Sequence, residues 1–436
     1  MILETLAQFA PVILIVVFLL GMVIGLPITW ALGITTVVTV AIDPGITFAV
    51  VGQKLFSSAD NFAMLAVPGF FLAGDIMTAG GLSKKLVEFA DSLVGWVTGG
   101  ISLVAIVSCA IFAAISGSSA ATTAAIGGIM YPEMVKRGYP SDYSTAVQAV
   151  GGTLGIIIPP SIVFVIYGST NGVSISKLLM SGMLPGILTA VVLCVYGYVV
   201  AKKENFPKSF DQFSLGRVFK SLKGAIWALM MPLIILGGIY GGIFTPTEAA
   251  AVAAMYGFVA GTFIYRELKL KDLPALLMNA GKSTAMVMVI VAAASSFGWI
   301  LTSARIPDAI ASFLISLSDS KYVILILINI FLLIVGCLMD VTASIIILTP
   351  IFMPIVNQFG IDPVHFGIIM TVNLAIGMST PPLGVNLFVS CGIAKISIEE
   401  NAKAMIKFLI ANLIALILII FIEPISLTIP KLMGLM

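Results

Sequence analysis

The sequence predicts an all-α polytopic membrane protein, built from an inverted-topology repeat with two re-entrant hairpins and two broken helices. The first observation is composition: 60% of the 436 residues are hydrophobic and 10% are charged, whereas about a quarter of the residues of a soluble protein carry charge. The second is a set of helix-breaking residues that recurs at one spacing. The third is the distribution of lysine and arginine, which fits two halves of opposite orientation.

The repeat is defined by four pairs of helix-breaking residues. The position numbers in each pair differ by 222: Pro132 and Pro354, Gly138 and Gly360, Gly155 and Gly377, Pro159 and Pro381. Each copy is apolar, is interrupted by small and polar residues, and is interrupted again at a proline pair (159–160 and 381–382). A fixed offset indicates an internal repeat. Because interrupted backbone at membrane depth survives only inside protein or beside a cavity, the paired interruptions predict a transport site.

Composition also excludes several classes of function. A net charge of +2 is too small to favour nucleic acid as a partner, and the single histidine, His365, excludes a His-rich metal site. The four cysteines lack metal-ligand spacing and no Gly-rich phosphate-binding motif occurs, so we expect no cofactor. Met1 leads directly into an apolar span without a cleavage site, so we expect no removable signal peptide.

In the first half, apolar length and breaking residues define the elements. Two spans and a short surface piece come first, followed by a span that contains Asp75 and by an amphipathic helix suited to the membrane interface. The first hairpin, a broken span, a further span and a polar cytoplasmic linker complete this half. The predicted ranges are 8–28, 31–51, 52–60, 61–79, 82–95, 99–135, 142–170, 178–200 and 201–224.

The second half repeats this order. It begins with two spans, a charged helix and a further span, followed by an amphipathic arm, the second hairpin and a second broken span. A surface helix and a final span close the chain. The predicted ranges are 225–243, 247–265, 266–278, 279–303, 305–318, 321–356, 363–392, 394–407 and 408–429.

The loop charges give an independent test of orientation. A cytoplasmic linker places the base of the first hairpin, Lys136 and Arg137, inside, and it places the base of the second hairpin, Gln358 and Phe359, outside. Only the inside base carries positive charge, as the positive-inside rule requires. The two hairpins should therefore enter from opposite faces, which puts a shared site near the middle of the membrane.

The first hairpin tip is a candidate cation site. A hairpin that ends within the membrane leaves unpaired helix-end carbonyls, and carbonyls and hydroxyls are hard oxygen ligands that suit Na⁺. The proline pairs free further carbonyls in the broken spans. The alternative is that these small residues only permit close helix packing. The tip consists of Ser116, Gly117, Ser118 and Ser119.

Three acidic residues lie at helix breaks. Asp340, in the second tip, aligns with Ser118, and we interpret it as a cation ligand, with an N-cap of the returning helix as the alternative. Asp75 is similar, although Gly74 and Gly80 indicate a helix end nearby. Glu248 is predicted to cap a helix start.

Other polar residues could contact a substrate, although each alone is more often a helix–helix hydrogen bond. No arginine lies within the repeated motifs, and the nearest, Arg305, fits an arm or interface residue better. The candidates are Ser295, Ser296, Asn171, Asn373 and Asn386.

Six stretches together resemble the large membrane subunit of tripartite ATP-independent periplasmic (TRAP) transporters, and the resemblance covers essentially the whole chain. They are PGFFLAGDIM (68–77), AAISGSSAATTAAIG (113–127), YPEMVKRGY (131–139), GGTLGIIIPPS (151–161), GIFTPTEAAA (242–251) and NLAIGMSTPPLGVNLF (373–388).

The resemblance implies an elevator-type fold of the ion-transporter superfamily. Its scaffold would comprise 1–60, 178–278 and 394–436, and its transport domain 61–177 and 279–393. It implies Na⁺-coupled uptake of an organic acid anion (a C4-dicarboxylate, sialic acid or a related sugar acid) across the bacterial inner membrane. It places one Na⁺ site at 116–119 with Gly151, Gly152 and Thr153, and the other at Asp340 and Thr342 with Gly377, Met378, Ser379 and Thr380.

The resemblance also implies partners. A soluble periplasmic binding protein would deliver the substrate, and a small four-helix membrane subunit would complete the complex. Since this chain begins directly at the large subunit, we expect the small subunit to be a separate chain.

Two other functions compete with transport by a carrier. An intramembrane aspartyl protease would need Asp75 and Asp340 about 3 Å apart and sharing a proton, and their flanking sequences lack the contexts typical of such enzymes. A channel is disfavoured because the hairpins have the form of occluding gates and not of a continuous pore.

Overall fold

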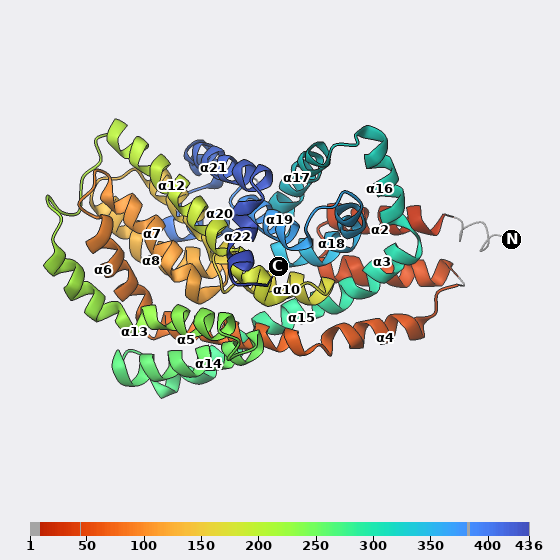
Figure 1. The fold of residues 1–436 in the computed structure, drawn as a ribbon, viewed down its shortest axis with the longest axis horizontal. Helices are drawn as coiled ribbons and strands as arrows, with labels where there is room; N and C mark the ends of the chain where they lie inside the picture. Colours follow the sequence, from red (N-terminus) through yellow and green to blue (C-terminus); the bar gives the residue numbers. More distant parts are fainter. Residues whose placement is uncertain (1–8, 44, 382–383, 436) are drawn as a thin grey trace.

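The computed structural model describes residues 9–43, 45–381 and 384–435, and within these ranges the chain forms helices and no strand. Figure 1 shows an elongated molecule, with the first hairpin toward one end, the N-terminal helices at the other, and helices of the second repeat between them. Among the described residues, eight helical segments are long and apolar enough to cross a membrane, or nine if one bent pair counts as a span.

The N-terminal helices differ from the prediction. The second predicted span (31–51) and the surface piece (52–60) are wrong, because one helix ends at Ile42 and 48–59 forms a helix of its own. The break falls at the sequence Asp-Pro-Gly (43–45), because a residue that precedes a proline disfavours the helical conformation. The Asp43 carboxylate also accepts a hydrogen bond of 2.9 Å from the Gly45 amide, which favours a turn. The helices are α2 (Ala10–Val23), α3 (Ile28–Ile42) and α4 (Phe48–Ala59).

The elements of the first repeat lie where the sequence places them. The hairpin turns at residues 117 and 118, and the broken span bends by 42° between its two helices. The elements are η1 (Phe62–Leu65), α5 (Ala66–Ala79), α6 (Leu82–Val94), α7 (Gly100–Ser116), α8 (Ser119–Lys136), α9 (Ser141–Ile157) and α10 (Ile162–Asn171).

The middle of the chain has a shorter linker than predicted. Only residues 204–214 lie outside helices, because one helix continues to Lys203 and the next starts at Leu215, where the Ser214 side chain caps it. The elements are α11 (Ile175–Ser181), α12 (Met183–Lys203), α13 (Leu215–Tyr240), α14 (Pro246–Val259) and η2 (Ala260–Ile264).

The second repeat confirms the arm, the hairpin and the broken span. The separate charged helix at 266–278 is wrong, since Leu273 begins a helix that runs unbroken to Ser303. The predicted division into a surface helix (394–407) and a final span (408–429) is also wrong, because one helix covers most of both ranges. This helix starts at a capping box of Ser397 and Glu400 and ends before Pro424. The elements are η3 (Leu270–Asp272), α15 (Leu273–Ser303), α16 (Ile306–Leu317), α17 (Lys321–Leu338), α18 (Val341–Gln358), α19 (Pro363–Gly377), α20 (Val385–Ala394), α21 (Ile398–Phe421) and α22 (Pro424–Leu432).

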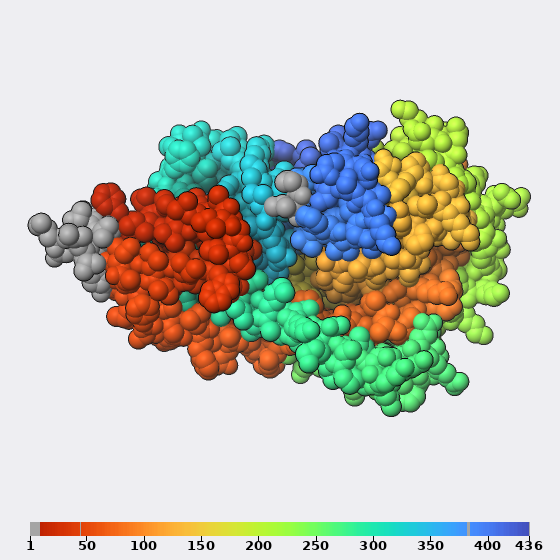
Figure 2. All heavy atoms as spheres, turned by 180° about the vertical axis from the view of Figure 1, so that it is seen from behind, coloured from red at the N-terminus to blue at the C-terminus, as the bar shows by residue number. Residues whose placement is uncertain are grey.

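The internal repeat is visible in helix boundaries and in packing. Helix α8 runs from 119 to 136 and α18 from 341 to 358, so both ends differ by the 222 residues of the sequence offset. The second segment of each broken span packs against the returning arm of the other repeat's hairpin: α10 against α18, and α20 against α8. In Figure 2 the blue C-terminal helices lie against the orange and yellow helices of the first repeat. This reciprocal packing of each repeat against the other is the arrangement expected of two halves related by a pseudo-two-fold axis.

The division into scaffold and transport domain stays a prediction, because packing alone does not show which helices move. The packing shows which helices lie together. Helix α12 packs against the hairpin arm α7 and against α9, and α21 packs against α9, α12 and α19, so both lie with the broken spans although the resemblance assigns them to the scaffold. A second group consists of α2–α5 with α13–α15, in which α5 packs against α14 and α15 against α3 and α4.

Candidate functional site

The first hairpin turns at Gly117 because only glycine fits there. Gly117 has a φ of +60°, and a Cβ atom on it would lie 2.8 Å from the Pro160 carbonyl oxygen. The Gly117 carbonyl accepts a hydrogen bond of 3.4 Å from the Ile162 amide, and the Ser118 side chain caps α8 by accepting from the Ala121 amide. The tip therefore lies directly against the break between α9 and α10.

Three oxygen atoms gather at this tip. The hydroxyls of Ser116 and Thr122 lie 2.7 Å apart, and the Thr122 hydroxyl donates to the Ser118 carbonyl at 2.8 Å. Ser116 and Thr122 are both at least 97% buried. Thr122 is not among the residues predicted from the sequence, although it lies four residues after Ser118, one helical turn away.

The Ser119 side chain begins a hydrogen-bond network that joins the two repeats. Its hydroxyl donates to the Gly152 carbonyl at 2.9 Å and accepts from the Asn386 side-chain amide at 2.7 Å. Asn386 also donates to the Ala149 carbonyl at 3.1 Å, which accepts in addition from the Ser379 hydroxyl at 2.9 Å. Residues from α8, α9, the second break and α20 thus meet in one fully buried cluster. The resemblance places Ser119 and Gly152 in one predicted site, whereas the contacts of Ser379 and Asn386 with this cluster come from the fold.

Glycines bring the first broken span close to the hairpin. A Cβ atom on Gly152 would overlap the Thr123 hydroxyl, and one on Gly155 would overlap the Ser118 carbonyl. At Gly151 it would lie 2.9 Å from the Cys109 sulfur. Thr153 turns its hydroxyl to the Val150 carbonyl of its own helix, at 2.6 Å. The predicted group at 116–119 and 151–153 is therefore brought together in space.

The second tip is capped by its carboxylate. Asp340 accepts a hydrogen bond of 2.8 Å on Oδ1 from the Thr342 amide, and its backbone carbonyl accepts from the Ser344 hydroxyl at 2.9 Å. Asp340 therefore acts as an N-cap of α18, which was the alternative to a cation ligand. A cap uses one carboxylate oxygen, and among the described residues no side chain or amide donates to Oδ2.

The second break meets its hairpin one turn before the tip. Gly336 of α17 packs against Gly377, where a Cβ atom would overlap the Gly336 backbone. The Thr380 hydroxyl donates to the Ile376 carbonyl at 2.8 Å, and the Met378 carbonyl accepts from the backbone amide of Asn386 at 2.9 Å. Within the described part of the chain, no hydrogen bond joins 340–342 to 377–380, and Pro382 lies outside it.

The predicted substrate residues fall into two groups. Three of them bond between or within helices: Ser296 donates to the Val51 carbonyl at 3.3 Å, Asn171 to the Tyr167 carbonyl at 2.7 Å, and Asn373 to the Asn329 side chain at 2.6 Å. Asn386 belongs to the buried network, and Ser295 lines a cavity. Asn329 was not predicted, because an asparagine within an apolar span gives no sign of its partner.

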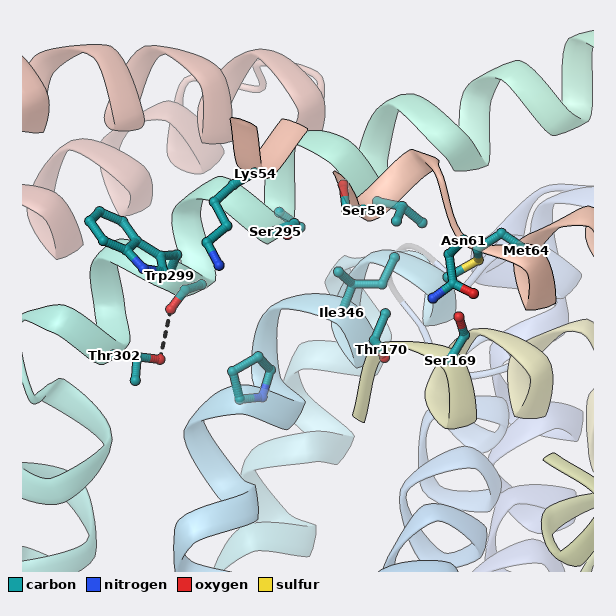
Figure 3. Close-up of a pocket in the computed structure, with 14 residues that line it drawn as sticks. Lys54, Ser58, Asn61, Met64, Ser169, Thr170, Ser295, Trp299, Thr302 and Ile346 are labelled. Atoms are coloured by element: carbon teal, nitrogen blue, oxygen red, sulfur yellow. Dashed lines mark hydrogen bonds between the residues drawn. The ribbon is translucent and has the colours of Figure 1, made fainter. Parts of the chain in front are cut away.

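The cavity that Ser295 lines is about 360 Å³ in volume and lies between α4, α10, α15 and α18. Figure 3 shows polar side chains that enter it from several of these elements. Lys54 and Ser58 come from α4, Ser169 and Thr170 from α10. Trp299 and Thr302 of α15 and Pro350 of α18 also line it.

The remaining acidic candidates are structural or isolated. Glu248 forms a capping box with Thr245, which confirms its predicted role. Asp75 is half-buried in α5, next to Gly74, which packs against the Ser116 backbone.

Comparison with known proteins identifies the family. The model of the tripartite ATP-independent periplasmic transporter, DctM component, matches residues 15–425. The chain is 41% identical to the C4-dicarboxylate TRAP transporter large permease protein DctM of Pseudomonas aeruginosa, over 93% of this chain and 94% of that protein. It is 39% identical to the 2,3-diketo-L-gulonate TRAP transporter large permease protein YiaN of Escherichia coli, over 92% and 94%. It is 46% identical to the isethionate TRAP transporter permease protein DctMQ of Oleidesulfovibrio alaskensis, over 92% of this chain, and spans 63% of that protein's length.

Solved structures support the fold. The chain resembles Neisseria gonorrhoeae MtrF with a TM-score of 0.57 at 13% identity, over 86% of this chain and 84% of that one. It resembles the Alcanivorax borkumensis YdaH transporter with a TM-score of 0.58 at 14% identity, over 87% and 89%. These neighbours confirm the predicted fold class, and the relatives, which are transporter components, confirm a transporter over the aspartyl protease. The chain belongs to the DctM family, the large membrane component of TRAP transporters.

Proposed function

We propose that this protein carries out Na⁺-coupled secondary uptake of an organic acid anion across the bacterial inner membrane by an elevator movement. A periplasmic binding protein would deliver the anion, and a small four-helix membrane subunit would complete the complex. The observation that carries the proposal is that each hairpin packs against a broken helix, and that the network of Ser119, Ser379 and Asn386 joins the first hairpin to both broken helices. Interrupted helices at a repeat interface are where secondary transporters bind solute and coupling ion.

The first tip offers three oxygen atoms of the kind that bind a sodium ion. Ser116, Ser118 and Thr122 contribute two hydroxyls and one carbonyl within hydrogen-bond distance of one another. These are neutral, hard oxygen atoms, which suit alkali and alkaline-earth cations and not soft metals. Both tips are also helix starts, where the positive end of the helix dipole favours an anionic group.

The second tip fits a cation differently. Asp340 would contribute the carboxylate oxygen that does not cap α18, and Thr342 and Thr380 would contribute backbone or hydroxyl oxygens. A carboxylate neutralises the charge of the cation, whereas the first tip has none. We therefore propose two cation sites of unequal character, with the solute anion bound between them and the cations partly cancelling its charge.

The relatives support an acidic solute. They are named as transporters of C4-dicarboxylate, 2,3-diketo-L-gulonate and isethionate, which are the anions of small organic acids. We infer that this chain also transports a small acid, such as a C4-dicarboxylate, sialic acid or a related sugar acid. The helices that we propose to move are the hairpins and broken spans, together with α12 and α21, which pack against them.

Uptake by the complete complex in proteoliposomes tests the proposal. Radiolabelled succinate, isethionate and sialic acid would be supplied with the binding protein, with and without an inward Na⁺ gradient. We expect saturable uptake of one acid class that stops when the Na⁺ gradient is collapsed. Uptake that persists without Na⁺, or flux that rises linearly with solute concentration, would contradict a Na⁺-coupled carrier.

A further inference from the structure

The cavity between the two helix groups contains a lysine whose position is unusual. The Lys54 side chain projects from α4 into the cavity, and Figure 3 shows its ammonium group between Trp299 and Ser295. The cavity volume of about 360 Å³ falls within the range of about 300–1,000 Å³ that is typical of small-molecule sites. By the orientation predicted from the loop charges, this end of α4 lies on the extracytoplasmic side, where the solute would arrive.

Lys54 has no acidic partner among the described residues. The ion pairs found there are Lys85 with Glu88 and Arg137 with Glu133, both at 2.8 Å and both within one helix. A lysine on a membrane helix can extend to the interface and remain hydrated, but Lys54 is half-buried and lines the cavity. A half-buried ammonium without a carboxylate is satisfied best by an anion from outside the chain.

The rest of the lining suits the polar part of a small acid. Ser169 of α10 has a buried hydroxyl with no hydrogen-bond partner among the described residues. Asn61 accepts from the Ala63 amide on Oδ1, which leaves its amide nitrogen to donate. Together with Ser295, these groups provide hydroxyl and amide donors around the cavity, whereas the Ser58 hydroxyl donates to the Leu55 carbonyl of its own helix; Trp299 provides one apolar wall. A few convergent polar groups in a mainly apolar cavity are typical of a ligand site.

We propose that this cavity binds the acid group of a small organic anion, with the ammonium of Lys54 as its electrostatic partner. As a step in uptake, the proposal rests on the function proposed above. Lys54 lies on α4, in the helix group without the hairpins, whereas Ser169, Thr170 and Pro350 lie in the group with them. An anion held here would therefore contact both groups before it reaches the hairpin tips. A cleft of one sign of charge also raises the local concentration of oppositely charged solutes.

Chemical labelling tests the charge preference without any need for transport. Ser295→Cys would be introduced into a permease whose four native cysteines are replaced, purified with its small subunit, and labelled with a sulfonate or a trimethylammonium methanethiosulfonate. We expect the ratio of the anionic to the cationic labelling rate to fall about tenfold in Lys54→Gln, a change within the range of electrostatic steering. Lys54→Arg should keep the ratio, and added salt should reduce it.

A matched control separates the cavity from general surface charge. Lys431 is an exposed lysine at the end of α22, on the same predicted side of the membrane and away from the cavity. Lys431→Gln should leave the labelling ratio at Ser295→Cys unchanged. An unchanged ratio in Lys54→Gln, or an equal fall in Lys431→Gln, would overturn the proposal. If Lys54→Gln does not fold, Lys54→Met provides the same test.

Uptake by the complete complex then tests the place of the site in transport. We expect Lys54→Gln to raise the KM for succinate or isethionate about tenfold with little change in kcat, and Lys54→Arg to restore it. A changed labelling ratio with an unchanged KM would mean that the cavity lies off the path of the solute, which overturns its proposed place in uptake. If the wild-type complex shows no Na⁺-driven uptake but the labelling ratio falls as expected, the function proposed above fails and the anion site stands.

Discussion

In both repeats the returning arm of the hairpin starts after an N-cap and runs for 18 residues, as α8 from Ser119 and as α18 from Val341. The caps differ: Ser118 uses a hydroxyl and Asp340 uses a carboxylate. The turns differ as well, since the first has Gly117 at a positive φ and the second has Met339 in an extended conformation. The two halves thus share the positions of their helix ends and differ in the groups that line them.

The polar network between the repeats shows the same difference more strongly. It joins Ser119, Ala149, Gly152, Ser379 and Asn386. The positions related to these by the offset of 222 are Val341, Thr371, Leu374, Ile157 and Phe164, of which only the threonine is polar.

A duplicated backbone therefore does not imply duplicated binding. Helix ends are set by caps, glycines and prolines, which act through the main chain, and the positions of the helix ends recur in both copies even where the capping residue differs. Hydrogen bonds between side chains depend on single residues, and these have diverged. We expect the two tips to bind cations with different affinities, and substitutions at related positions to have unequal effects.

The largest effect is expected at the glycines that are common to both repeats. Gly155 and Gly377 lie at the same position of the repeat, and a Cβ atom on either would overlap the backbone of a neighbouring segment. Backbone atoms cannot move aside as a flexible side chain can, so Gly155→Ala and Gly377→Ala should each lower the free energy of unfolding by about 1–3 kcal/mol or more. Thermal unfolding of the purified protein in detergent measures this.

Gly128 provides the matched control, because a Cβ atom on it would meet nothing within 4 Å. Gly128→Ala lies inside α8 and should be neutral or stabilising by about 0.5–1 kcal/mol, since alanine restricts the unfolded chain more than glycine does. If only one of the two close-packed glycines proves sensitive, the repeats differ in their backbone packing as well as in their side chains.

A smaller effect is expected where the network exists in one repeat only. Asn386→Leu keeps the branched shape of the side chain, with bulkier methyl groups, and removes the bonds to Ser119 and Ala149. The loss of buried hydrogen bonds should lower the free energy of unfolding by about 1–3 kcal/mol. Chemical denaturation would follow this variant beside Ser390→Ala, which removes only a local bond to the Leu387 carbonyl on the same helix. Equal effects of the two substitutions would mean that the network adds no stability between the repeats.

The sequence predicted those parts of the fold that depend on main-chain breaks. The fixed offset located both hairpins and both broken spans, and the Thr245–Glu248 pattern identified a capping box. The prediction failed at 43–45, where the Asp-Pro-Gly turn signal lies within a long apolar run, and at 266–278, where only the last residues of the charged segment belong to an α-helix, which continues to Ser303.

The sequence predicted two groups of site residues, one for each repeat, and not the contacts between the repeats. Asn386 and Ser119 are 267 positions apart, and no local pattern indicates that they meet. Lys54 was assigned to a surface piece, because only the packing of α4 against α15 shows that it faces a cavity. Only the tertiary arrangement shows which of the polar residues contact one another and which face a cavity.

The smallest effect on stability, and the sharpest test of the difference between the tips, is expected from Asp340→Asn. Asparagine is as good an N-cap as aspartate, so the bond to the Thr342 amide should remain and the free energy of unfolding should change by less than about 0.5 kcal/mol. The negative charge is lost, and we expect the KM for Na⁺ in uptake to rise about tenfold while the complex still assembles. Ser118→Ala is the counterpart in the first repeat: it removes a cap, which costs about 0.5–2 kcal/mol, and no charge. An unchanged dependence on Na⁺ in Asp340→Asn would show that the carboxylate only caps α18, because a ligand that loses its charge cannot hold a cation equally well.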